Sequence, residues 1–176
     1  MNRVGMDLYL EMLEEAVARI KGNPLERVAE TEVTLGLPAH IPETYIEDGR
    51  ERLRCYKALT SATTGAARED VALSMRDRFG PFPEELRNFL AMLDFKQFLA
   101  ELQVQKADVY DDHVRLIWPD GQTAVSPEDV ISLTAAMPGS RILPPSGLHL
   151  PLSKDVPFSE GLRELRAMLE RLHCKA

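Results

Sequence analysis

The chain has 176 residues, of which 44% are hydrophobic, and its formal net charge is −7. This length accommodates one domain with a sizeable core, or one domain with a short appendage, and the apolar content excludes a disordered chain. The acidic balance argues against direct binding of nucleic acid, because non-specific affinity for phosphate backbones comes from clustered Lys and Arg.

The first predicted element is an amphipathic helix over about Val4–Lys21. Its apolar residues recur at helical spacing, and several more widen the stripe, which predicts contacts on more than one side. Gly22-Asn23-Pro24 ends this helix. Thr31–Leu35 alternates polar and apolar residues and predicts a strand, after which Pro38 and Pro42 impose an extended connection.

Three consecutive helices are predicted next. They cover about Asp48–Ala62, Ala67–Phe79 and Pro83–Leu102. The first contains a basic stretch, Arg50 to Lys57, in which acids are interspersed, and this favours a solvated face with internal ion pairs. The third is apolar nearly all round, which is typical of a central helix covered by others.

The middle helix has two distinct faces at helical spacing. The expected inward residues are Val71, Ala72, Met75 and Phe79. The opposite face carries Asp70, Ser74 and Asp77, with Leu73 at its edge. This face is either an ordinary solvated surface or a modest docking patch, because an apolar residue bordered by acids on a rigid element is typical of such patches.

A rigid corner is predicted where Asp77–Leu86 joins the second and third of these helices. Gly80 supplies a position where a left-handed backbone costs little, and Pro81 prevents the helix from continuing. Pro83 pre-sets the first turn of the next helix, whose acidic first residues suit its positive end. The side chains that can pin this corner to a core are Phe79 and Phe82.

From residue 104 onward the pattern changes to short strands and further helices. Ala107–Tyr110 and Val114–Trp118 predict a hairpin. A helix is predicted from Ser126 to about Met137, further strands at Arg141–Leu143 and Leu148–Leu150, and a last helix over Phe158–His173 with the stripe Leu162, Leu165, Leu169 and Leu172. The fold class is therefore α+β: a helical N-terminal half, to about residue 103, packed on a smaller mixed α/β half over 104–176.

The motifs that usually carry chemistry are missing from the sequence. It contains no glycine-rich phosphate loop, dinucleotide fingerprint, zinc-protease helix or nucleophile elbow. Cys55 lies mid-helix among basic residues without a nearby histidine, so it is expected to be a small packed side chain. The histidines are scattered without metal-ligand spacing; they are His40, His113, His149 and His173. We therefore predict no catalytic residue, no cofactor and no metal.

The cellular compartment is also predicted from the sequence. No run approaches the roughly 20 apolar residues that span a membrane. Met1–Leu10 carries Asp7 and passes into an acidic helix, so it is not a signal peptide. Two distant cysteines, Cys55 and Cys174, are too few for a disulfide framework. These features predict a cytoplasmic protein that does not contact a membrane.

Four separated motifs together resemble a known family. They are Gly5–Leu13 (GMDLYLEML), Glu30–Val33 (ETEV), Tyr45-Ile46 with Arg52-Leu53 and Tyr56-Lys57, and Asp77–Gly80 (DRFG) with Pro83. No single motif is specific, but their order and spacing resemble the C-terminal domain of bacterial transcription-repair coupling factor. The resemblance runs from about residue 4 to 104 and continues more loosely to about 172.

The resemblance implies a non-catalytic, autoinhibitory module. Members of this family are ATP-driven DNA translocases that remove stalled RNA polymerase and recruit nucleotide excision repair through UvrA. Residues 1–22 would be the junction helix that follows the motor module, and 23–176 the C-terminal regulatory domain. That domain would pack against the UvrB-like module of the same chain and hide its UvrA-binding surface, so that UvrA and RNA polymerase are indirect partners.

The resemblance also implies which residues make the masking contact. In the family this contact uses acidic positions on the helix before the Arg-Phe-Gly corner. Asp77 matches one such position, whereas Ser74 stands where a relative has an acid. Two other functions stay open. One is a small stand-alone enzyme with an unrecognised site in 104–176, for which Trp118, Asp120 and His149 are the candidate residues, and the other is a binding adaptor unrelated to repair.

Overall fold

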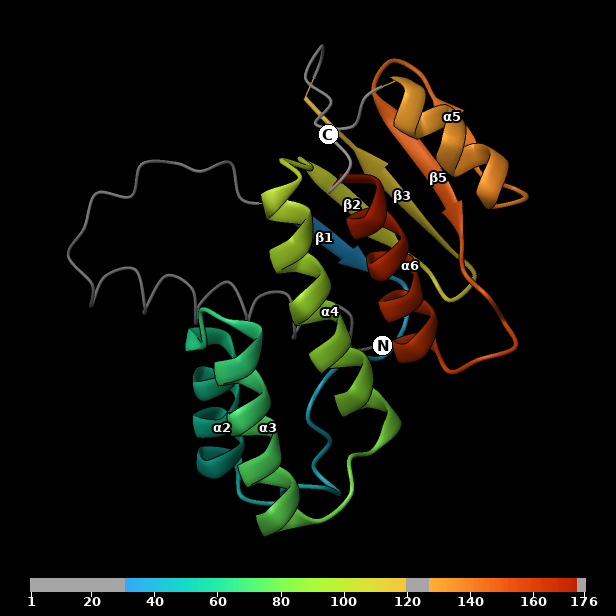
Figure 1. The fold of residues 1–176 in the computed structure, drawn as a ribbon. Helices are drawn as coiled ribbons and strands as arrows, with labels where there is room; N and C mark the ends of the chain where they lie inside the picture. Colours follow the sequence, from blue (N-terminus) through green and yellow to red (C-terminus); the bar gives the residue numbers. More distant parts are fainter. Residues whose placement is uncertain (1–30, 120–126, 174–176) are drawn as a thin grey trace, which may run out of the picture.

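The structure is a computed structural model that describes residues 31–119 and 127–173. These residues form five helices and five strands around one mixed sheet (Figure 1). The strands are β1 (Glu32–Leu35), β2 (Lys106–Val109), β3 (His113–Ile117), β4 (Arg141–Leu143) and β5 (Gly147–Pro151). The helices are α2 (Gly49–Ser61), α3 (Gly65–Phe79), α4 (Glu84–Glu101), α5 (Pro127–Ala136) and α6 (Phe158–His173). The predicted α+β class is therefore confirmed.

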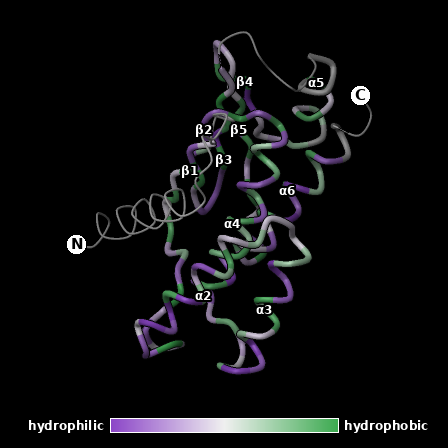
Figure 2. The backbone as a smooth tube through the Cα atoms, turned by 90° about the vertical axis from the view of Figure 1, so that its left-hand side faces the viewer, coloured by the Kyte–Doolittle hydropathy of each residue, from purple (hydrophilic) through white to green (hydrophobic). Residues whose placement is uncertain are grey.

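The sheet has the strand order β1-β2-β3-β5-β4. Strand β1 is parallel to β2, with Glu32 opposite Lys106, and the other neighbours are antiparallel. Side chains alternate between buried and half-buried along β2 and β3, as expected when one face of a sheet packs on a core. Helices α4 and α6 lie on that buried face (Figures 1 and 2).

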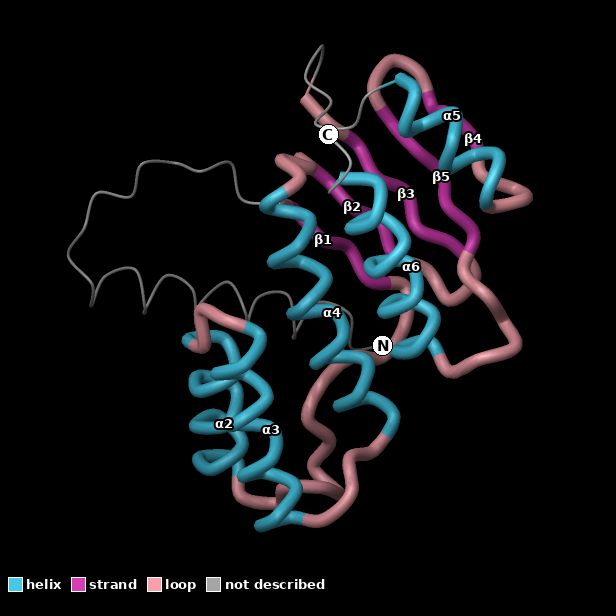
Figure 3. The backbone as a smooth tube through the Cα atoms, viewed as in Figure 1, coloured by secondary structure: helices cyan, strands magenta, loops and turns pink. Residues whose placement is uncertain are grey.

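Helices α2 and α3 pack with the first half of α4 into a separate layer (Figure 3). Helix α2 begins where the sequence predicts, whereas α3 begins at Gly65, two residues before its predicted start, and side-chain caps explain both positions. Asp48 accepts hydrogen bonds from the backbone N–H groups of Arg50 and Glu51, and Thr64 accepts one from Ala67. Such N-caps satisfy donors that the helix itself leaves unpaired.

Helix α4 belongs to two hydrophobic cores, which confirms the prediction of a central helix. Leu86 and Phe89 in its first half pack with α2 and α3 in what we call the helical core. Phe95 and Leu99 in its second half pack with the sheet and α6 in the sheet core. One continuous helix therefore holds the two layers together.

The predicted corner between α3 and α4 is also confirmed. Gly80 has φ +92°, a backbone conformation that L side chains rarely adopt. Phe79 and Phe82 pack half-buried against the helical core, as expected. The sequence did not reveal Tyr45, whose ring meets both phenylalanines edge-on and whose hydroxyl donates to the Gly80 carbonyl oxygen at 2.9 Å.

The remaining predicted elements have different outcomes. The hairpin of β2 and β3, the strands β4 and β5 and the helices α5 and α6 lie where the sequence predicts. On α6, Leu162, Leu165 and Leu169 are buried in the sheet core. The predicted helix over Val4–Lys21 and the residues Asp120 to Ser126 lie outside the described residues, as does the side chain of Leu172.

Candidate functional site

Helix α3 presents one face to the helical core and the other to solvent. Ala72 and Met75 are buried, while Val71 and Phe79 are half-buried, so the predicted inward face is confirmed. The four residues predicted as a docking patch are all exposed. We call them the acidic face of α3: Asp70, Leu73, Ser74 and Asp77.

The carboxylates of the acidic face make no ion pair with any described residue. Within residues 31–119 and 127–173, no hydrogen bond or ion pair engages the side chain of Asp70 or Asp77. Glu51 on neighbouring α2 is different, because it pairs with Arg78 at 2.5 Å and with Arg54 at 3.2 Å. The hydrogen bond from Arg78 is the main cause that lowers the pKa of Glu51. The acids of α3 thus remain available for an external partner.

Arg68 fixes the start of α3 against the middle of α4. Its guanidinium is buried and contacts the Asp94 carboxylate at 2.6 Å. It also donates to the Gln97 side-chain oxygen at 3.1 and 3.3 Å, and Gln97 in turn donates to the Thr63 carbonyl. This network sets the position of α3, and therefore of its acidic face, relative to α4.

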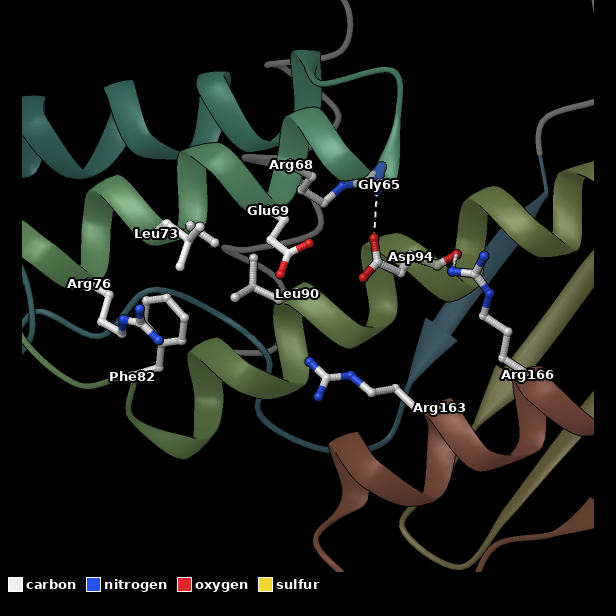
Figure 4. A pocket seen from close by; sticks show the side chains of 11 residues that line it. Gly65, Arg68, Glu69, Leu73, Arg76, Phe82, Leu90, Asp94, Arg163 and Arg166 are labelled. Carbon is white, nitrogen blue, oxygen red and sulfur yellow. Dashed lines mark hydrogen bonds and ion pairs between the residues drawn. The ribbon is translucent and has the colours of Figure 1, made fainter.

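An open groove of about 450 Å³ separates α3 from α4 and α6 (Figure 4). We call it the α3 groove. It is lined by Gly65, Arg68, Glu69, Ala72, Leu73, Arg76, Phe82, Leu90, Asp94, Arg163 and Arg166. Leu73, which is 38% exposed, belongs to both the acidic face and the groove.

The charges around the α3 groove are unevenly paired. Arg68 is neutralised by Asp94, and Arg166 pairs with Glu170 at 2.7 Å. Arg76 from α3 and Arg163 from α6 have no ion pair among the residues that the structure describes. Figure 4 shows the Arg163 side chain extending from α6 across the groove. The groove therefore combines two arginines that have no ion pair among the described residues, the Glu69 carboxylate and apolar walls.

The basic stretch of α2 is used for internal pairing, as predicted, although one partner lies outside the helix. Arg54 pairs with Glu51 inside the helix, while Arg52 reaches back to Glu43 at 2.8 Å. Cys55 is buried among these residues, and the loss of solvation raises the pKa of its thiol. A thiol with a raised pKa is a poor nucleophile, consistent with the packed side chain predicted.

Two of the three residues considered for an enzyme site, Trp118 and His149, lie on opposite faces of the sheet. Trp118 is 2% exposed in the sheet core, and its indole N–H donates to the Leu102 carbonyl oxygen at 2.9 Å. His149 lies on β5 between the buried Leu148 and Leu150, so its side chain faces the opposite side of the sheet. Asp120 lies outside the described residues. Trp118 and His149 therefore cannot line one cleft.

Two histidines that are distant in the sequence meet on the sheet. The ring centroids of His113 and His149 lie 4.7 Å apart with the rings tilted, and the ring of Tyr110 stacks on His113 with the centroids 4.6 Å apart. Loss of solvation and then the charge of His113 lower the pKa of His149. Within the described residues, no three His, Cys, Asp or Glu side chains gather as metal ligands would. Antiparallel pairing of β3 with β5 brings these rings together, and sequence spacing does not show it.

Sequence reasoning missed Arg68 and the arginines that line the groove from α6. A signal for Arg68 was present, because it falls in register with the buried positions Ala72 and Met75. An arginine among the inward-facing residues of a helix predicts a carboxylate partner, because a buried charge is costly unless it is paired. No comparable signal pointed to Arg163, which reaches the groove only through the packing of α6 beside α4.

Among the described helices, none combines the length and the apolar character that crossing a bilayer requires.

Comparison with known proteins gives one consistent result. The family model described as the TRCF domain matches residues 35–129, more than half of the chain. Transcription-repair-coupling factor of Bacillus subtilis is 36% identical over 114 residues, covering 64% of this chain and 10% of the relative. The Myxococcus xanthus protein of the same name is 35% identical over 112 residues, covering 64% of this chain and 8% of the relative.

Two further matches agree with these. Transcription-repair-coupling factor of Escherichia coli is 34% identical over 113 residues, covering 61% of this chain and 10% of the relative. A crystal structure of the C-terminal domain of transcription-repair coupling factor superposes with a TM-score of 0.67 at 21% identity. It covers 84% of this chain and 96% of the solved one. The chain spans about a tenth of the length of the curated relatives it matches.

Proposed function

Because the chain belongs to the TRCF domain family, we propose that it is a non-catalytic regulatory module of a much larger transcription-repair coupling factor. In this proposal the parent is an ATP-dependent DNA translocase of the bacterial cytoplasm that couples transcription to nucleotide excision repair. The module covers the UvrA-binding surface of a UvrB-like module in the same chain. UvrA and RNA polymerase are then reached only indirectly.

The observation that carries this proposal is the acidic face of α3. Asp70 and Asp77 are exposed and unpaired among the described residues, and Leu73 adds an apolar contact beside them. A contact that must open when the motor engages should be of moderate strength and partly electrostatic. An exposed acidic face on a helix that is fixed by Arg68 and by the Gly80 corner has these properties.

The test is to remove the Asp77 carboxylate in the full-length parent protein. Loss of one charge from a partly buried interfacial pair costs about 2–5 kcal/mol. If the covered state outnumbers the exposed state of the UvrA-binding surface by roughly 99 to 1, this loss substantially increases the exposed fraction. Asp77→Ala is therefore expected to increase UvrA binding in a pull-down. Ser74→Asp adds a carboxylate to the same face and is expected to decrease it.

Asp155→Ala is the matched control, because it removes an identical charge from an exposed position outside α3. It should leave UvrA binding unchanged. If Asp77→Ala and Asp155→Ala give the same UvrA binding as the unmodified protein, Asp77 takes no part in masking and the acidic face loses its proposed role.

A further inference from the structure

We propose that the α3 groove binds an acidic amphipathic helix of a partner protein, which places carboxylates against Arg76 and Arg163 and apolar side chains against Leu73 and Phe82. The groove adjoins the acidic face of α3 and shares Leu73 with it, whereas Asp70, Ser74 and Asp77 do not line the groove. The inference stands independently of the masking proposal, because it needs neither UvrA nor a UvrB-like module.

Charge complementarity identifies the partner as acidic. The chain as a whole carries a net charge of −7, yet this one groove is lined by four arginines against two carboxylates, those of Glu69 and Asp94. Two of the arginines are neutralised within the fold, and Arg76 and Arg163 remain without an ion pair among the described residues. Arginine offers a planar set of donors that matches a carboxylate in two-point contacts.

The apolar walls favour a protein segment over nucleic acid. Leu73 is exposed, Phe82 is half-buried, and Ala72 and Leu90 form buried surface between them. The groove also contains the carboxylates of Glu69 and Asp94, which would repel a continuous phosphate backbone. A peptide avoids this repulsion because its carboxylates are discrete and its apolar residues can cover the walls.

The dimensions of the groove favour a short helix. The lining residues of α3 run from Gly65 to Arg76, three turns that span roughly 17 Å. Arg163 stands on the facing wall formed by α6 (Figure 4). A helix of similar length between two helical walls is the helix-in-groove mode, in which residues spaced by three and four make the apolar contacts.

Arg68 provides a second polar feature at this groove. The residue is 7% exposed, and its Nε–H has no acceptor in the described part of the chain. Buried donors are normally satisfied in a folded protein. A carboxylate from a bound helix would place negative charge beside this arginine. The attraction between this carboxylate and the Arg68 guanidinium would favour binding in the groove.

The test measures fluorescence anisotropy of a labelled peptide with the complete 176-residue chain. The probe is a designed helix of about 12 residues with leucines on one side and glutamates flanking them. Saturable binding to the chain is expected. A counterpart with lysine in place of every glutamate is expected to bind at least about tenfold more weakly, because it meets Arg76 and Arg163 with like charge.

Variants then assign the binding to the groove. Arg163→Glu and Leu73→Ala should each weaken the glutamate peptide, and Arg76→Glu with Arg163→Glu should weaken it about tenfold or more. Arg141→Glu is the matched control, since it reverses the same charge on β4, away from the groove, and should have no effect. Far-UV circular dichroism of each variant confirms that it is folded.

Two results would overturn the proposal. The first is that the glutamate peptide binds no better than the lysine peptide, or equally well to Arg163→Glu and Leu73→Ala. The second is that oligothymidylate of similar length binds more tightly than the glutamate peptide and loses its affinity in Arg163→Glu, which would make the groove a nucleic-acid site. Neither result depends on UvrA, so both are distinct from a failure of the masking proposal.

Discussion

Arg68 is the residue on which the position of α3 depends most directly. Arg68→Met removes the charge from a side chain that is 8% exposed and leaves the Asp94 carboxylate, itself 33% exposed, without its partner. Breaking a fully buried pair costs about 3–5 kcal/mol. Because Asp94 retains some solvent, we expect a loss of about 2 kcal/mol in the free energy of unfolding, measured by urea denaturation.

Arg54→Met is the control for this experiment. It breaks the Arg54–Glu51 pair, in which the arginine side chain is 79% exposed, and should cost less than about 1 kcal/mol. Equal losses in the two variants would mean that burial of Arg68 does not strengthen its pairing, and that α3 is held by its apolar contacts alone.

At the residue scale, local sequence signals predicted what depends on neighbours in the chain. The spacing of Asp70, Ser74 and Asp77 placed them on one exposed face, because helical geometry alone determines that outcome. The partners of Arg68 and Tyr45 could not be predicted, since Asp94 is 26 positions away and Gly80 is 35. Such pairs follow from tertiary packing, which has no local sequence pattern.

At the scale of elements, the described helices and the Gly80 corner were predictable, whereas the sheet order was not. Alternation of side chains predicted β1, but its parallel pairing joins Glu32 to Lys106 across most of the helical half. The α3 groove could not be predicted either, because its walls come from three separate helices, α3, α4 and α6. Sequence periodicity identifies which face of each helix is apolar without identifying which helix it meets.

The corner between α3 and α4 supports a prediction at this scale. Gly80→Ala places a Cβ at φ +92° and ψ −166°, a region that is essentially restricted to glycine. Nothing lies within 4 Å of the new methyl group, so the cost is conformational. We expect a loss of about 1–3 kcal/mol, measured as a lower urea midpoint.

Gly65→Ala is the matched control, because Gly65 begins α3 with open space around it and an ordinary φ. Alanine there should be neutral or should stabilise by up to about 1 kcal/mol, since it reduces the freedom of the unfolded chain. If both variants shift the midpoint in the same direction and by the same amount, the backbone at Gly80 is not what shapes the corner.

At the scale of the whole molecule, α4 makes the two hydrophobic cores interdependent. Leu86 and Phe89 anchor it in the helical core, and Phe95 and Leu99 anchor it in the sheet core. Unfolding one core would expose half of a helix whose other half is still packed. The two layers should therefore unfold in one cooperative transition, as small domains usually do.

The single tryptophan of the chain makes this cooperativity measurable. Trp118 lies in the sheet core, while Met75, 3% exposed, lies in the helical core. Met75→Ala leaves a cavity that costs about 2–5 kcal/mol. We expect the urea midpoint reported by Trp118 fluorescence to fall by the same amount as the midpoint reported by far-UV circular dichroism.

Ile142→Ala provides the reference, because Ile142 is 59% exposed and its truncation should move either midpoint very little. If Met75→Ala instead divides the dichroism curve into two steps and leaves the Trp118 midpoint unchanged, the helical layer unfolds by itself. In that case α4 would connect two units that unfold independently, and a change in the stability of the helical core would not affect the sheet core. A single shared transition would mean that the stability of α3, and of its acidic face, depends on the whole domain.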